Sequence, residues 1–157
     1  MLLKGIREED FLQYKKPSMV ILFPNCTFKC NKESGCAVCQ NSALANSLPI
    51  EVSVTEIINK YKSNYITSSI VFAGLEPFDS FDDMIKLISV FRMFTLDDIV
   101  IYTGYYKEEI ADRLEQLKDF SNIIVKFGRF VPNDKRTFDD VLGVFLASSN
   151  QHAERIS

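Results

Sequence analysis

Ser18-Met-Val-Ile-Leu-Phe23 is the apolar run around which the rest of the chain is organised. A short continuous run of this kind predicts a buried strand. A cysteine-rich loop, residues 26–39, follows the run, and the helix-prone Ser42-Ala-Leu-Ala45 comes soon after the loop. A strand, a loop and a helix in this order place the loop at the end of a strand, where sites of α/β proteins usually form.

The loop contains all four cysteines of the chain, Cys26, Cys30, Cys36 and Cys39. Thiolates gathered on one short loop are typical ligands of soft metals and iron–sulfur clusters. Three thiolates on a four-iron cluster leave one iron open, whereas four thiolates on one ion form a closed site of the zinc type. The two cysteine pairs are only five residues apart, closer than in the common zinc pattern. The spacing therefore favours a cluster, with zinc and disulfide pairing as alternatives.

Length and composition bound the class of protein. The chain has 157 residues, of which 46% are hydrophobic and 25% charged, so we expect one soluble domain spanning residues 1–157. The net charge of −3 and the absence of a basic block argue against a nucleic-acid surface. Neither a signal peptide nor an apolar run of ~18 residues is present, so we expect a cytoplasmic protein with no membrane partner. In a reducing cytosol, clustered cysteines favour metal ligation over disulfides.

Beyond the loop, the sequence predicts helices and strands in alternation. The further predicted strands, each ended by a glycine, are Ser69–Ala73, Asp98–Thr103 and Asn122–Phe127. The first predicted helix follows a sequence that resembles a capping box, Ser53-Val-Thr-Glu56. The second opens at Ser80-Phe-Asp-Asp83 and has an apolar stripe of Met84, Leu87, Ile88 and Phe91, and the third spans Lys107–Lys118. A last apolar segment, Val141–Leu146, is predicted as a strand or a buried turn. The alternation indicates an α/β domain with a mainly parallel sheet, and the strands are too few for a full eightfold barrel of ~250 residues. We therefore predict a partial (β/α) barrel.

A second group of residues with chemical meaning ends the strand at Ser69–Ala73. It reads Gly74-Leu75-Glu76-Pro77. Gly74 allows a sharp turn and a close approach of the backbone to a ligand, and Pro77 fixes the turn that follows. Glu76 at a strand end is suited to accept hydrogen bonds from an ammonium group.

At these residues the chain resembles the radical S-adenosylmethionine enzymes. Their signature is Cys-x3-Cys-x2-Cys after the first strand and a Gly-Gly-Glu-Pro-like motif ending the second. Cys26-x3-Cys30 matches the first half, and Ala73-Gly-Leu-Glu-Pro77 is similar to the second motif, with Leu75 in place of one glycine. Within this superfamily the chain most resembles the activating proteins of anaerobic ribonucleotide reductase. That likeness rests on chain size, Gln40-Asn41, Ile101–Gly104 and Leu146–Gln151, and it runs from about residue 21 to 151.

The resemblance implies a [4Fe–4S] cluster held by Cys26, Cys30 and Cys39. The family has two residues between the second and third cysteines, whereas here Cys36 follows Cys30 after five and Cys39 after eight. Cys39 is favoured because the apolar Val38 precedes it, where the family has an apolar residue near the adenine. Gln40-Asn41 follows it, where the family has a polar residue and an asparagine. Cys36 would then be a spare thiol or a fourth ligand.

The resemblance also implies an activity. S-adenosylmethionine would bind the open iron, with its amino group near the turn formed by Gly74, Leu75, Glu76 and Pro77. Its reductive cleavage would produce a glycyl radical on the partner, a large glycyl-radical reductase subunit, with a one-electron donor such as flavodoxin. No side chain is assigned as catalytic, because the cofactors carry the chemistry.

Two other functions remain as alternatives. One is a small radical enzyme acting on a different protein or small molecule, and the other is a non-catalytic zinc-binding interaction module. Outside the two motifs, a mildly basic stretch is expected to form a solvated face, with a docking surface for a partner protein as the alternative. Its members are Lys126, Arg129, Lys135 and Arg136.

Overall fold

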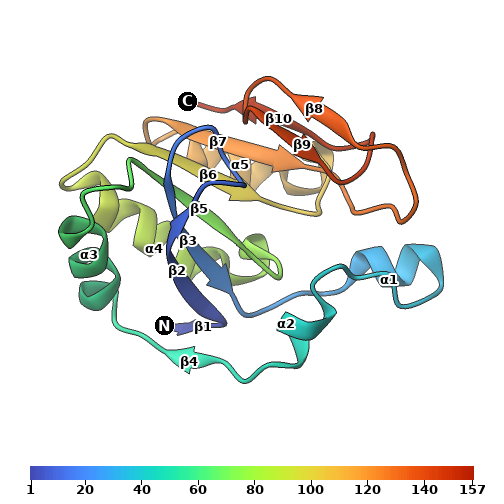
Figure 1. Ribbon diagram of the computed structural model, residues 1–157, viewed down its shortest axis with the longest axis horizontal. Helices are drawn as coiled ribbons and strands as arrows, with labels where there is room; N and C mark the ends of the chain where they lie inside the picture. The colour runs from blue at the N-terminus through green and yellow to red at the C-terminus, as the bar shows by residue number, and fades with distance from the viewer.

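The computed structural model describes residues 1–157 as a six-stranded sheet with two small two-stranded sheets beside it (Figure 1). The strand order in the large sheet is β10-β7-β6-β5-β3-β2, and β1 pairs with β4 and β8 with β9. The strands are β1 (Leu2–Leu3), β2 (Gly5–Asp10), β3 (Ser18–Phe23), β4 (Ile50–Glu51), β5 (Ser69–Gly74), β6 (Asp98–Tyr102), β7 (Ile123–Phe127), β8 (Thr137–Asp139), β9 (Val144–Leu146) and β10 (His152–Arg155).

The four central strands, β3, β5, β6 and β7, are parallel, and the two edge strands, β2 and β10, are antiparallel to their neighbours. This arrangement confirms the predicted α/β class and the mainly parallel sheet. The predicted partial barrel is not confirmed: the strands form one mixed sheet with β2 and β10 at its two edges. The central strands were predictable because strands buried on both faces read as apolar runs. The edge strands read Gly5-Ile-Arg-Glu-Glu-Asp10 and His152-Ala-Glu-Arg155, charged sequences that give no such signal.

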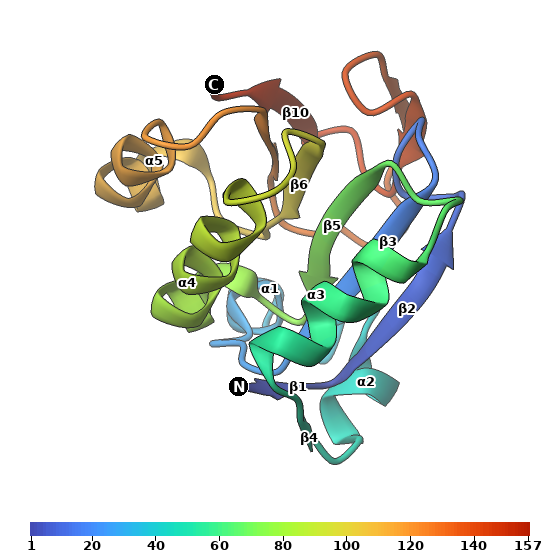
Figure 2. The same cartoon turned by 90° about the vertical axis from the view of Figure 1, so that its left-hand side faces the viewer.

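Five α-helices connect the strands: α1 (Lys29–Ser34), α2 (Ser42–Asn46), α3 (Val54–Ser63), α4 (Phe81–Arg92) and α5 (Ala111–Leu117). Three of them, α3, α4 and α5, cover one face of the sheet (Figure 2). The predicted cap of α3 is present, since the Ser53 side chain accepts a hydrogen bond from the Glu56 N–H. The stripe predicted for α4 is its buried face: Met84, Leu87, Ile88 and Phe91. Residues 107–118, predicted as one helix, form a 3₁₀ turn at Lys107–Ile110 followed by α5.

The two faces of the sheet have different functions because side chains alternate along each strand. Met19, Ile21 and Phe23 of β3 face the helices and belong to the main core. Val20 faces the other way and packs with Val71, Val100 and Ile124 in a second core, which the segments containing Tyr14, Leu142 and Leu146 help to cover. Toward the carboxyl ends of the strands this second face borders a cavity. No helix in the chain is both long and apolar enough to cross a membrane.

Gly74 occupies a position that other residues would strain. Its φ is +95°, and a Cβ atom placed there would lie 2.6 Å from the Phe23 backbone nitrogen. We expect Gly74→Ala to lower the free energy of unfolding by about 2–4 kcal/mol, since it adds left-handed strain to a backbone clash. Urea unfolding of the cluster-free chain measures this.

Gly104→Ala is the matched control. A Cβ atom there would meet its nearest neighbours at 3.6 and 3.9 Å, which is ordinary contact. We expect a change within about 0.5–1 kcal/mol. Equal losses in the two variants would contradict the assignment of close approach to Gly74.

Candidate functional site

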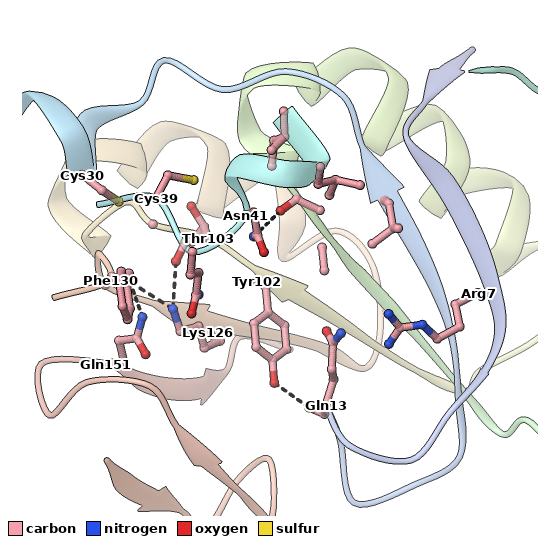
Figure 3. Close-up of a pocket in the computed structure, with 18 residues that line it drawn as sticks. Arg7, Gln13, Cys30, Cys39, Asn41, Tyr102, Thr103, Lys126, Phe130 and Gln151 are labelled. Carbon is pink, nitrogen blue, oxygen red and sulfur yellow. Dashed lines mark hydrogen bonds between the residues drawn. The ribbon is translucent and has the colours of Figure 1, made fainter. Parts of the chain in front are cut away.

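A cavity of about 470 Å³ lies at the carboxyl ends of the parallel strands (Figure 3). Its floor includes a row of side chains from four adjacent strands: Leu22, Ala73, Tyr102 and Lys126. Gly74 and Leu75 of the predicted turn line it, as do Cys30 and Cys39 of the cysteine loop. Figure 3 shows Cys30 and Cys39 at one end of the cavity and Arg7 at the other. Two motifs that are more than thirty residues apart in sequence therefore meet at one site.

The structure separates the four cysteines into three and one. Cys26 and Cys30 border a small hollow beside the main cavity, and Cys30 and Cys39 border the cavity itself. Cys36 is exposed and lines neither space. All four are free thiols, so the disulfide alternative is wrong for this structure. Burial raises the pKa of the Cys26 thiol to about 11, and the charges of Glu76 and Asp79 act in the same direction.

Glu76 joins the ends of two neighbouring strands. Its side chain is buried, and one carboxylate oxygen accepts hydrogen bonds from Thr103 Oγ1 at 2.8 Å and the Phe78 N–H at 3.1 Å. The other oxygen accepts from the Gly104 N–H at 2.8 Å. In this structure the carboxylate is thus occupied by donors of the protein, and its predicted contact with an ammonium group stays a prediction. Burial raises the pKa of Glu76 to about 7, against the opposing effect of these hydrogen bonds.

The other residues predicted around the turn lie in different places. Pro77 is buried and opens a 3₁₀ turn at Pro77–Ser80, which fits its predicted part in shaping the turn. Leu75 is half-buried and lines the cavity. The Gly74 carbonyl accepts a hydrogen bond from Asn41 Nδ2 at 2.7 Å, which ties the end of the cysteine loop to β5. Val38 is half-buried but does not line the cavity.

A family model described as "4Fe-4S single cluster domain" matches residues 17–153, which is most of the chain. The chain belongs to this family. The match covers the cysteine loop, the four parallel strands and the helices between them. No curated protein and no solved structure matches the chain.

The residues present fit the [4Fe–4S] cluster that membership of the 4Fe-4S single cluster domain family indicates. Cys26, Cys30 and Cys39 are unpaired thiols around two adjoining spaces, and thiolates are the usual ligands of such clusters. No three cysteine, histidine or carboxylate side chains converge as they do around a single metal ion. Gly104 leaves room beside the loop, since even a Cβ atom there would lie 3.9 Å from Cys30 Sγ.

Lys126 is a site residue that the sequence analysis placed wrongly. It was expected on a solvated face with Arg129, but both side chains are buried, and only Lys135 and Arg136 of that stretch are exposed. Lys126 Nζ donates to the Gly128 carbonyl at 3.0 Å and has no carboxylate partner. Burial lowers its pKa to about 8. The signal that could have found it is position: a lysine within Ile123-Ile-Val-Lys-Phe127 lies inside a buried strand.

Arg129 connects the sheet to the cysteine loop. Its guanidinium makes two hydrogen bonds to the Glu109 carboxylate, each 2.7 Å, and its Nε lies 2.8 Å from Glu33 Oε1 in α1. Lys29 of α1 completes the group through a 2.7 Å bond to Glu109. The hydrogen bonds from Arg129 are the main reason that the pKa of Glu109 falls to about 2.

The carboxy-terminal Ser148-Ser-Asn-Gln151 segment supports the same edge of the sheet. Gln151 Oε1 accepts from the Ala147 N–H at 3.0 Å, and its Nε2 donates to the Gly128 carbonyl at 3.2 Å. Ser148 Oγ donates to the Arg129 carbonyl at 3.3 Å. These contacts hold the backbone that follows β7, directly beside Lys126.

Glu76 predicts a pH dependence of stability. Its pKa is about 7 in the folded chain and 4.5 ordinarily, so between these values the folded chain keeps a proton that the unfolded chain has lost. The free energy of unfolding should therefore fall, by about 3 kcal/mol, as the pH rises from about 4.5 to 7. Urea unfolding of the cluster-free chain across this range measures the slope. In Glu76→Gln the slope should flatten, and an unchanged slope would assign the effect to other groups.

Proposed function

We propose that this chain is a radical S-adenosylmethionine activase whose [4Fe–4S] cluster is held by Cys26, Cys30 and Cys39. The observation that carries the proposal is the meeting of two motifs at one cavity, since Cys30 and Cys39 border it together with Gly74 and Leu75. Cys26, Cys30 and Cys39 would hold the cluster, and when bound it would supply one electron for the reductive cleavage of S-adenosylmethionine that leads to a glycyl radical on the partner.

The charge of the cavity supports a ligand of this kind. The residues that line it include two cations, Arg7 and Lys126, and no aspartate or glutamate. A buried lysine without an anionic partner gains the most from a ligand carboxylate, because the pair removes the cost of burying a lone charge. Lys126 is thus the proposed partner of the methionine carboxylate.

The strand-end turn supplies groups for the opposite charge. The Gly74 carbonyl accepts a hydrogen bond from the side-chain amide of Asn41, so it points toward the segment that follows the cysteine loop. The ammonium group of S-adenosylmethionine is also an N–H donor. We propose that it binds at the Gly74 carbonyl, beside Leu75 and Glu76. Val38 precedes Cys39 and remains the proposed neighbour of the adenine.

The proposed partner is the large subunit of an anaerobic glycyl-radical ribonucleotide reductase, with a one-electron donor such as flavodoxin. We further propose that residues 1–157 act as one domain and that the parallel strands, with the helices between them, are a short form of the partial (β/α) barrel. A barrel of so few strands leaves a radical little cover, so the large partner is expected to close the site.

The first test is cleavage of S-adenosylmethionine by the anaerobically reconstituted chain with a chemical reductant. The wild type should form 5′-deoxyadenosine. Lys126→Met should raise the KM for S-adenosylmethionine by about 10- to 100-fold, the value of a lost charge-assisted hydrogen bond of about 1.5–3 kcal/mol. Product chromatography across a range of S-adenosylmethionine concentrations measures both.

The control is Lys135→Met, which removes an exposed lysine of the same basic stretch and should leave KM unchanged. A chain with a full cluster that forms no deoxyadenosine contradicts the catalytic proposal. A colourless chain with one tightly held zinc ion would instead support the zinc-binding module.

The cysteine assignment has its own test. Cys39→Ala should lose most of its bound iron, because the cavity loses one of the two thiols that border it, whereas Cys36→Ala should keep it. Iron and sulfide analysis with the visible absorption spectrum measures the cluster in each variant. Iron-replete Cys39→Ala protein would show that Cys39 is not a ligand.

A further inference from the structure

The eight residues between Cys30 and Cys39 pose a structural problem. A flexible loop of this length would leave the position of Cys39 undefined, and it contains a second thiol, Cys36, that could take the same place. The structure nevertheless brings Cys39 back to the cavity that Cys30 borders and leaves Cys36 exposed. Some contact within the loop must produce this choice.

The contact is made by one side-chain oxygen. Asn31 Oδ1 accepts hydrogen bonds from the Val38 N–H at 3.0 Å and the Cys39 N–H at 2.9 Å. Asn31 is the residue after Cys30, so these two bonds close the inserted segment back onto its own beginning. The ends of the loop are thus brought together.

The residues between Asn31 and Val38 are folded away from the cavity. Residues 29–34 form α1, which projects beyond the ends of the strands in Figure 1, and Gly35 ends it in the left-handed region with φ of 69°. Cys36 follows this glycine and is exposed, and its Sγ donates a hydrogen bond to the Ser34 hydroxyl at 3.9 Å. The spare thiol therefore lies on the outer turn of the insertion.

A helix as short as α1 has little stability of its own, and none of its residues is buried. Its charged side chains instead pair with segments that follow the strands: Lys29 with Glu109 in the 3₁₀ turn after β6, and Glu33 with Arg129 just after β7. Because these ion pairs keep α1 in place, Asn31, which lies in α1, holds the Val38 and Cys39 amides in a defined position.

We propose that Asn31 is a positioning residue that presents Cys39, rather than Cys36, as the third cluster ligand. The inference rests on the proposed ligation by Cys26, Cys30 and Cys39 and extends it to the residue that selects among the cysteines. What the position requires is an acceptor oxygen on a short side chain. Aspartate supplies that oxygen and alanine does not.

The experiment compares Asn31→Ala with Asn31→Asp in two states. In the cluster-free chain, hydrogen exchange of the Val38 and Cys39 amides should accelerate about 10-fold in Asn31→Ala and stay slow in Asn31→Asp. In the reconstituted chain, iron loss to a chelator should be about 10-fold faster in Asn31→Ala and near wild type in Asn31→Asp. Asn46→Ala, an asparagine on the exposed side of α2, is the matched control and should change neither measurement.

A combined variant tests the selection itself. In Asn31→Ala the remaining cluster should depend on Cys36, so Asn31→Ala with Cys36→Ala should hold less iron than Asn31→Ala alone. The electron paramagnetic resonance spectrum of the reduced cluster should change in Asn31→Ala and return in Asn31→Asp.

The outcomes separate this inference from the proposed function. A wild-type chain that binds no iron contradicts the ligand assignment, and the proposal about Asn31 falls with it. A wild-type cluster that is unchanged by Asn31→Ala, in spectrum, iron retention and tolerance of Cys36→Ala, contradicts the role of Asn31 alone. If Asn31→Ala speeds amide exchange but leaves the cluster unchanged, the role of Asn31 is also contradicted. The hydrogen bonds would then exist without positioning the ligand.

Discussion

The parallel pairing of β3 with β5 is the constraint on which the site depends. Phe23 lies opposite Gly74 in this register, and only a residue without a side chain allows the backbones to come so close. The cysteine loop leaves the sheet just after Phe23, and the Gly-Leu-Glu-Pro turn begins at Gly74. Because the strands are parallel, both segments leave the sheet at the same edge, and this alone brings the two motifs together.

The polar groups at this edge have unequal surroundings. Glu76 is a buried acid whose two oxygens are already occupied by three donors of the protein. Lys126 is a buried base that has only backbone carbonyls as partners. Burial opposes charge in both, yet only the lysine borders the cavity with donor capacity to spare, since an ammonium group has three donors. In the proposed site this asymmetry favours Lys126 as the stronger ligand contact, whereas Glu76 would share oxygens that already accept hydrogen bonds from the protein.

The sequence predicted those features that are decided by local pattern. The central strands and the stripe of α4 follow from apolar runs and helical spacing, and the turn at Gly74 follows from residue type. Cys39 lies at the cavity, and its role as the third cluster ligand, favoured from the family resemblance of Val38 and Gln40-Asn41, stays a prediction. What sequence reasoning missed depends on tertiary contacts. The charged β2 becomes a strand only because β3 offers it an edge, and Lys126 is buried only because its strand lies inside the sheet.

The segment between Cys30 and Cys39 shows how a long loop can return close to the point where it began. The cost of closing a loop grows only slowly with length, so six additional residues are cheap in entropy if the ends are fixed. Here the fixing contacts are hydrogen bonds of Asn31 within the loop and ion pairs of α1 with Arg129 and Glu109, and none requires a change in the core. The geometry that matters to a cluster is set by where the thiols enter the cavity, not by the number of residues between them. A spacing longer than Cys-x2-Cys is therefore compatible with the proposed cluster site, provided that a side chain such as Asn31 closes the loop.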